Sequence, residues 1–175
     1  GNVFCGVIHR LDRPVSGLVL FAKTSKALSR MNELFRNKSI QKTYWAIVEK
    51  APDKAHGTLE HYLIKNQKKN KSHAYLKPHN GALKAVLNYK TLKHLDRYSL
   101  LEINPISGRH HQIRVQLSAI NSIIKGDLKY GAKRSNKDAS ICLHARKINF
   151  IHPVKKELIE ICAPPPKNPI WQACL

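Results

Sequence analysis

The sequence has few acidic residues, few cysteines and no long hydrophobic run, and each shortage excludes a class of protein. No segment approaches the roughly 20 consecutive apolar residues of a membrane-spanning helix, and the first residues lack the pattern of a signal peptide. Four cysteines without CxxC spacing, in a chain of 175 residues that is 42% hydrophobic, indicate reduced thiols rather than a disulfide framework. We therefore expect a cytoplasmic protein with one domain or two closely packed lobes.

Motifs for metals and nucleotide cofactors are also missing. Ten histidines include the adjacent pair His110 and His111, whose side chains would diverge on a helix. No HxxxH pair lies on a helix face, and no cysteine joins a histidine at zinc-finger spacing. The GxGxxG and GxxxxGKS loops and the GxSxG elbow are absent. We expect neither a metal nor a cofactor.

Positive charge is what the chain has in excess. Lys and Arg number 31 against 11 Asp and Glu, a net charge of +20. A domain this basic usually binds a polyanion, so RNA or DNA is the first candidate partner. The segment KNQKKNK (65–71) contains Lys68, Lys69 and Lys71 and no apolar residue. It is either a solvated loop or a loop that contacts phosphates, and the sequence favours neither.

Hydrophobic periodicity predicts strands and helices in mixed order. The apolar run at 17–23 predicts a buried strand. A helix over 25–37 can be capped by Thr24 or Ser25, and 42–49 predicts a strand with Tyr44 and Thr43 on opposite faces. The remaining expected elements are a strand near 57–64, a hairpin of 83–94 and 98–104 turning at Asp96-Arg97, a helix within 106–121, and strands at 141–150 and 157–162. The proline-rich segment 163–169 must leave the sheet.

One carboxylate stands out in VIHRLDRPVSGLVLFAKT (7–24). Asp12 is flanked by His9, Arg10 and Arg13. Arginines favour the ionised form of a nearby carboxylate, which is a poor general acid but can act as a nucleophile or a base. Taken alone, this pattern is more often that of a structural loop carboxylate.

Four segments in order resemble one enzyme family, the RluA family of pseudouridine synthases. HRLDRPVSG (9–17) resembles its signature HRLDxxTSG, with Val15 where threonine is usual. KTYWAIV (42–48) resembles its K-x-Y strand. SGRHHQIRVQLSAINSIIKGDLKYGA (107–132) resembles GRTHQIRVHLAxxGxPIxGDxxYG, with His110 where threonine is common. The segment 141–166 resembles LHAxxLxFxHPxxxExxxxxAPxP, so the likeness covers nearly the whole chain.

The resemblance implies a fold, a reaction and residue roles. The fold would be α+β, a mixed, largely antiparallel sheet in two lobes with flanking helices and the active site between the lobes. The reaction would isomerise uridine to pseudouridine in rRNA or tRNA without cofactor or metal. Asp12 would be the nucleophile, Tyr44 would pack on the target base, and Arg114 would pair with Asp12. The residues expected to contact RNA are Arg10, which would fill the gap left by the flipped base, and His9, Arg13, Arg109, Lys68, Lys69 and Lys71.

The chain also departs from the family pattern. Family members usually carry further residues before the signature, and many carry a separate small RNA-binding domain. We therefore expect residues 1–175 to be a catalytic domain that lacks its N-terminal portion, acting as a monomer without an obligatory protein partner or membrane contact. Two other functions are considered, a non-catalytic RNA-binding protein on the same scaffold and an N-glycosidase that releases the base.

Overall fold

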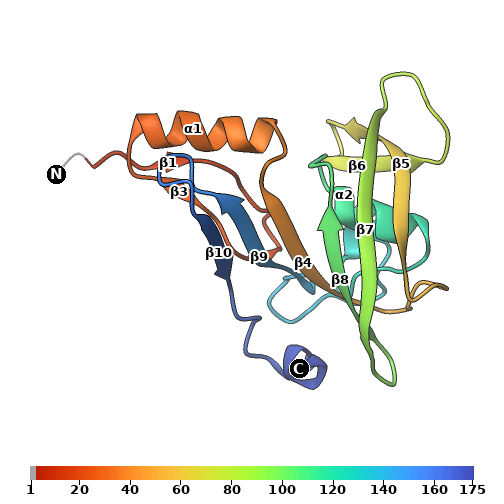
Figure 1. Cartoon of the computed structure of the whole chain (residues 1–175). Helices are drawn as coiled ribbons and strands as arrows, with labels where there is room; N and C mark the ends of the chain where they lie inside the picture. The colour runs from red at the N-terminus through yellow and green to blue at the C-terminus, as the bar shows by residue number, and fades with distance from the viewer. Residues whose placement is uncertain (1–2) are drawn as a thin grey trace.

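The computed structural model describes residues 3–175, which form an α+β fold around one large sheet (Figure 1). Its strand order is β10-β9-β4-β8-β7-β5-β6, and β2 pairs with β9. Neighbouring strands are antiparallel, except that β2 runs parallel to β9. The elements are β1 (Gly6–Val7), β2 (Ser16–Gly17), β3 (Phe21–Ala22), α1 (Ser25–Arg36), β4 (Gln41–Val48), β5 (His56–Asn66), β6 (Lys71–Tyr75), β7 (Leu83–His94), β8 (Ser99–Pro105), α2 (Gln112–Ala119), the 3₁₀ turn η1 (Leu128–Tyr130), β9 (Leu143–Ile151), β10 (Leu158–Cys162) and α3 (Pro169–Cys174). The expected fold class is confirmed.

Two lobes flank the central strand β4. The α1 lobe contains β1, β3, α1, β9 and β10, and the α2 lobe contains β5 to β8 and α2 (Figure 1). Each lobe has its own apolar cluster. Met31, Ile40, Ile148 and Phe150 form the core under α1. The larger core combines residues of β4, β7, β8, α2 and α3, and it includes Ile47, Leu87, Leu101, Ile103, Leu117 and Trp171.

The predicted helix at 25–37 is confirmed, with its cap. The Oγ1 atom of Thr24 accepts a hydrogen bond from the backbone N–H of Ala27 at 3.1 Å, which satisfies one of the free donors at the helix start. Met31 is buried against the sheet, as its place on the apolar stripe predicts. The strands predicted at 42–49 and 57–64 and the hairpin at 83–104 are also present.

The strand predicted over 17–23 is wrong. Only Ser16–Gly17 and Phe21–Ala22 form ladder pairs, and they pair with different partners, β9 and β1. Leu18 and Leu20 lie between them and pack against the α1-lobe core without a continuous ladder. An apolar run does not specify strand pairing, and here Leu18 and Leu20 are half-buried by side-chain packing while Phe21 is 55% exposed.

Strand β6 and helix α3 are among the elements that were not predicted. Strand β6 begins inside the lysine-rich segment, where Lys65 pairs with Ser72 across a tight turn and Asn70 adopts a positive φ of 43°. A polar edge strand gives no apolar alternation to detect. Helix α3 follows the proline-rich segment and is capped by Asn168, whose Oδ1 accepts from Trp171 N. Among the helices of residues 3–175, none is both long and apolar enough to cross a membrane.

Candidate active site

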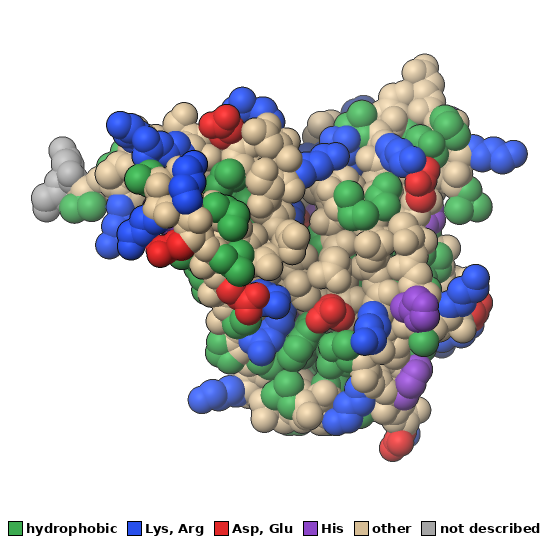
Figure 2. Space-filling view, viewed as in Figure 1, with side chains coloured by type: hydrophobic (Ala, Val, Ile, Leu, Met, Phe, Trp, Pro, Cys, Tyr) green, Lys and Arg blue, Asp and Glu red, His purple; other side chains and the backbone are tan. Residues whose placement is uncertain are grey.

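A cavity of about 930 Å³ lies between the two lobes, where the surface is hollowed in Figure 2. The loop between β1 and β2 contributes Asp12, strand β4 contributes Tyr44, and helix α2 contributes Arg114. The end of α1, strand β9 and the β8–α2 loop complete the wall. The volume is at the upper end of the range for small-molecule sites, so it can hold a nucleotide.

The loop that carries Asp12 is fastened to the sheet just after the carboxylate. A turn closes when Val15 N donates to Asp12 O at 2.9 Å, and Ile141 N donates to Pro14 O at 2.9 Å. Ser16 Oγ and His144 Nδ1 share a hydrogen bond of 2.9 Å across the parallel pairing of β2 with β9. These contacts hold the backbone of Asp12 at the cavity rather than in solvent.

Gly17 allows this close parallel pairing. Its φ of +118° is a conformation that residues with a Cβ rarely adopt, and an added Cβ would lie 2.4 Å from Ala145 O. The Ser-Gly pair of the signature is therefore explained by geometry, because the chain must turn where its backbone touches β9.

Arg114 lies between two carboxylates. Its Nη1 donates to Asp12 Oδ2 at 3.2 Å, while Nε and Nη2 donate to the two oxygens of Asp127 at 2.7 and 2.8 Å. Arg114 and Asp127 are 5% and 1% exposed, and the guanidinium carbon lies 5.1 Å from the centre of the Tyr130 ring. The bidentate pair fixes the guanidinium plane and aims the remaining N–H at Asp12.

Asp127 and Tyr130 were given no role from the sequence. Both lie in the GDLKYG stretch (126–131), which was used only to match the family pattern. A buried arginine needs a buried carboxylate. The aspartate in this stretch was therefore the residue from which a partner for Arg114 could have been predicted.

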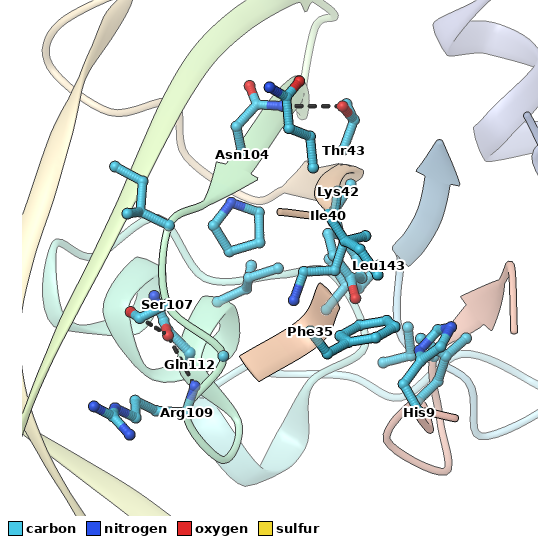
Figure 3. Close-up of a pocket in the computed structure, with 18 of the residues that line it drawn as sticks. His9, Phe35, Ile40, Lys42, Thr43, Asn104, Ser107, Arg109, Gln112 and Leu143 are labelled. Atoms are coloured by element: carbon cyan, nitrogen blue, oxygen red, sulfur yellow. Dashed lines mark hydrogen bonds between the residues drawn. The ribbon is translucent and has the colours of Figure 1, made fainter. Parts of the chain in front are cut away.

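The start of α2 is held against β7 by a network of side-chain hydrogen bonds. Gln112 Oε1 accepts from Ser107 Oγ at 2.9 Å and from Arg109 N at 3.0 Å, and Gln112 Nε2 donates to Val86 O at 3.0 Å. Figure 3 shows Ser107, Gln112 and Arg109 together on the wall that faces Phe35 and His9. The network positions the helix turn from which Arg114 projects.

Tyr44 lies on β4 next to a β-bulge. The register changes between Thr43, opposite Lys147, and Tyr44, opposite Ala145, so Arg146 is left without a partner residue on β4. Such a bulge re-aims neighbouring side chains. Burial and the nearby charge of Asp12 raise the pKa of Tyr44 to about 12, so its phenol keeps its proton at neutral pH.

The residues predicted to contact RNA divide into two sets. His9, Arg10 and Arg109 line the cavity with the three predicted catalytic residues. Arg13, Lys68, Lys69 and Lys71 do not line it, although Lys71 Nζ lies 5.2 Å from the Tyr130 ring. The Nε2 of His9 accepts from Leu20 N at 3.1 Å, so this ring also has a structural contact. Burial and the charge of Lys42 lower the pKa of His9.

Lys42 lines the cavity and is the lysine of the K-x-Y pattern, but no role was predicted for it from the sequence. Figure 3 shows it beside Phe35, and its Nζ lies 5.8 Å from the centre of that ring. Burial lowers the pKa of Lys42. The other cations that line the cavity are Arg10, Arg36, Lys38, Arg109, Arg114 and Lys147. Glu102 and Asp12 are the carboxylates among its described lining residues, so the cavity attracts an anionic ligand.

The α+β fold and the basic cavity with its Asp–Arg–Asp chain can now be compared with known protein families. Residues 1–119 match the family model described as RNA pseudouridylate synthase, so the chain belongs to this family.

Its relatives extend the match to most of the chain. A ribosomal large subunit pseudouridine synthase C from Buchnera aphidicola is 36% identical over 171 residues, covering 93% of this chain and 54% of the relative. A tRNA pseudouridine synthase C from Haemophilus influenzae is 32% identical, covering 89% of this chain and 72% of the relative. The chain thus spans between about half and three quarters of these relatives' lengths.

Solved structures show the same fold. Human RNA pseudouridylate synthase domain containing 4 superposes with a TM-score of 0.78 at 25% identity, covering 93% of this chain and 72% of that chain. Human RNA pseudouridylate synthase domain containing 1 superposes with a TM-score of 0.81 at 24% identity, covering 98% of this chain and 73% of that chain.

Proposed function

We propose that this chain is the catalytic domain of an enzyme that isomerises uridine to pseudouridine in structured RNA, either rRNA or tRNA. The observation that carries the proposal is Asp12, held through one carboxylate oxygen by a buried arginine at the wall of a basic cavity. Relatives named for both rRNA and tRNA substrates support the same chemistry.

The reaction exchanges one bond at the sugar for another. The C1′–N1 bond breaks, the uracil turns, and a C1′–C5 bond forms, while C5 loses a proton and N1 gains one. A base stacked in a helix cannot turn, so it must be flipped out, which costs a few kcal/mol. A cavity of about 930 Å³ can hold the flipped nucleotide and limit access of water to the detached base.

Asp12 has one oxygen engaged and one available. Arg114 donates to Oδ2, and within residues 3–175 no hydrogen bond reaches Oδ1. The carboxylate is 30% exposed toward the cavity side of its loop. We assign the covalent or basic role in the reaction to Oδ1, because Oδ2 is neutralised by the arginine.

Tyr44 offers an aromatic face and a protonated hydroxyl to the flipped base. Stacking of a base on an aromatic side chain contributes roughly 1–3 kcal/mol. A pKa of about 12 excludes a resting phenolate at neutral pH, so Tyr44 would hold the base or donate a proton rather than accept one initially.

RNA affinity would come from the cations around the cavity. Arg10 is exposed at the rim, where it can enter the gap left by the flipped base, and Arg109, Lys38 and Lys147 can meet backbone phosphates. We further propose that the protein acts in the cytoplasm as a monomer, with RNA as its partner and with Arg13 and the lysines of the β5–β6 turn as outer contacts.

The test compares Asp12→Asn with a matched control. Asp12→Asn keeps the side-chain shape and removes the charge, and Asp53→Asn makes the same change at a site 95% exposed on the surface. Each variant, carried in the full-length protein, is incubated with unmodified cellular RNA, and pseudouridine is mapped chemically. We expect pseudouridine with the wild type and Asp53→Asn and none with Asp12→Asn.

Other outcomes identify other functions. Equal pseudouridine with wild type and Asp12→Asn would contradict the assignment. Release of free uracil would instead indicate an N-glycosidase. Saturable binding of the RNA with neither product would indicate a non-catalytic RNA-binding protein.

A further inference from the structure

His111 lies beside Asp12 and takes no part in the steps proposed for Asp12, Tyr44 and Arg114. Its side chain is 7% exposed, and its Nε2 is 3.6 Å from Asp12 Oδ2, the oxygen that also accepts from Arg114. This separation is slightly longer than a hydrogen bond, and catalytic hydrogen bonds are often long before the substrate binds. The contact raises the question of which imidazole nitrogen carries the proton.

The hydrogen bonds around Tyr130 favour one of the two tautomers. Ser72 N donates to the Tyr130 hydroxyl at 2.8 Å, so the hydroxyl oxygen acts as an acceptor there. The hydroxyl proton is then free for His111 Nδ1, 2.9 Å away. With Nδ1 accepting, a neutral imidazole carries its proton on Nε2, the nitrogen that faces Asp12.

A left-handed backbone conformation directs the His111 ring toward Asp12. His111 has φ 52° and ψ 25°, a left-handed conformation, at the residue that caps α2. A non-glycine residue in this conformation costs of order 1 kcal/mol or more and persists where its surroundings hold it. The ring also stacks on His110, with centroids 3.8 Å apart and an interplanar angle of 22°.

Burial, more than the surrounding charges, keeps the imidazole neutral at physiological pH. Burial lowers the pKa of His111 to about 4. Arg114 on α2, the adjacent His110 and Lys129 on η1 also lower this pKa, while Asp12 on its loop raises it. Tyr130, which faces Nδ1, is a neutral phenol because burial raises its pKa.

We propose that His111 is a positioning residue for Asp12, a neutral imidazole whose Nε2–H donates to Oδ2 and leaves Oδ1 free for the RNA. This inference rests on the proposed function. Two donors on one oxygen fix the rotation of the carboxylate about its Cβ–Cγ bond, which a single long contact from Arg114 would not. The imidazole adds a donor without adding a second positive charge next to the reactive carboxylate.

The first experiment reads the tautomer in the wild-type protein. Imidazole nitrogens are followed by long-range ¹H–¹⁵N correlation spectra at pH 7, and the His111 signals are assigned by their loss in His111→Gln. We expect a protonated Nε2 and an unprotonated Nδ1. A protonated Nδ1, or an imidazolium at pH 7, would overturn the proposal. This readout does not depend on any activity.

The second experiment separates positioning from folding. His111→Phe keeps a ring of similar size and removes both nitrogens, whereas His111→Gln places an amide N–H near the position of Nε2. We expect His111→Phe to lower the pseudouridine-forming rate at saturating RNA by about tenfold, the effect of losing a hydrogen bond to a charged group. RNA affinity should be unchanged, and His111→Gln should recover most of the rate.

Tyr130→Phe tests the partner of Nδ1. It keeps the ring beside Arg114 and removes the hydroxyl, so the preference for the Nε2–H tautomer is lost and the rate should fall several-fold. Tyr89→Phe, at a buried tyrosine of the larger core, is the matched control and should leave the rate unchanged.

The outcomes distinguish this proposal from the assignment of the reaction. If Asp12→Asn forms as much pseudouridine as the wild type, the proposed function fails, whatever the tautomer is. If Asp12 is required but His111→Phe retains the full rate, or His111→Gln is as slow as His111→Phe, the positioning role alone is refuted. A loss of rate matched by an equal loss of RNA affinity would refute it as well.

Discussion

Replacing Asp127 should destabilise the protein more than any surface substitution, because it leaves a buried arginine with one partner. Asp127→Asn keeps the side-chain volume but removes the charge opposite Nε and Nη2 of Arg114. The two side chains are 1% and 5% exposed. Removing one member of such a buried pair costs about 3–5 kcal/mol of unfolding free energy.

This free energy corresponds to a large change in melting temperature. For a domain of 175 residues, each kcal/mol lowers Tm by about 2–4 °C, so we expect a decrease of about 6–20 °C. Urea unfolding followed by circular dichroism gives the free energy directly. Asp96→Asn, at an exposed turn between β7 and β8, should stay within about 0.5 kcal/mol of the wild type.

A double-mutant cycle tests the cause of the loss. Arg114→Met removes the buried cation, so Asp127→Asn should cost much less in that background than in the wild type. At a temperature where Asp127→Asn is folded, the pseudouridine-forming rate should also fall, because the guanidinium is no longer held toward Asp12. Equal losses in both backgrounds, or a loss below about 1 kcal/mol, would refute this account of the pair.

Three further predictions address Tyr44, acid stability and Gly17. Tyr44→Phe keeps the aromatic face and removes the hydroxyl, so RNA affinity should be retained while a rate loss measures proton donation; an unchanged rate would limit Tyr44 to stacking. Burial lowers the pKa of His111 from 6.5 to about 4, so between these values the unfolded chain binds a proton that the folded chain does not. Urea unfolding should therefore show stability falling as pH drops from 6.5 to 4, by up to about 3 kcal/mol from this residue, with a shallower slope in His111→Gln. Gly17→Ala should lower the unfolding free energy by at least about 2 kcal/mol, since it adds a contact with Ala145 O to a strained φ. Gly81→Ala, where φ is +74° and no atom lies within 4 Å of the added Cβ, is the control and should show a smaller loss in the same measurement.

Elements with strong local signals could be predicted from the sequence. Helix α1 has a cap, an apolar stripe and a polar face, and the β7–β8 hairpin has long strands around a short turn. The run at 17–23 misled the prediction because hydrophobicity does not specify strand pairing, and Leu18 and Leu20 are half-buried by side-chain packing without a continuous ladder. Strand β6 is a polar strand at the sheet edge and therefore shows no apolar alternation, while helix α3 depends on packing with distant segments, which local patterns do not contain.

The candidate site could be predicted in part. Resemblance indicated Asp12, Tyr44 and Arg114, which line one cavity in the structure, and their catalytic roles stay predictions. It did not indicate Asp127 or the orientation of His111, because both act through geometry. One depends on a carboxylate meeting an arginine 13 positions away, and the other on a left-handed backbone and a tyrosine 19 positions away.

The parallel pairing of β2 with β9 also sets the order in which the site can be assembled during synthesis. Ser16 and His144 are 128 positions apart, and ribosomes add about 5–20 residues per second, so the loop that carries Asp12 waits roughly 6–25 seconds for its strand partner. During that interval the positively charged chain can already attract RNA electrostatically, while the carboxylate lacks its strand anchor and, until the chain reaches residue 114, its arginine as well. Under the proposed function, a nascent chain would therefore attract RNA before its site could act on a uridine.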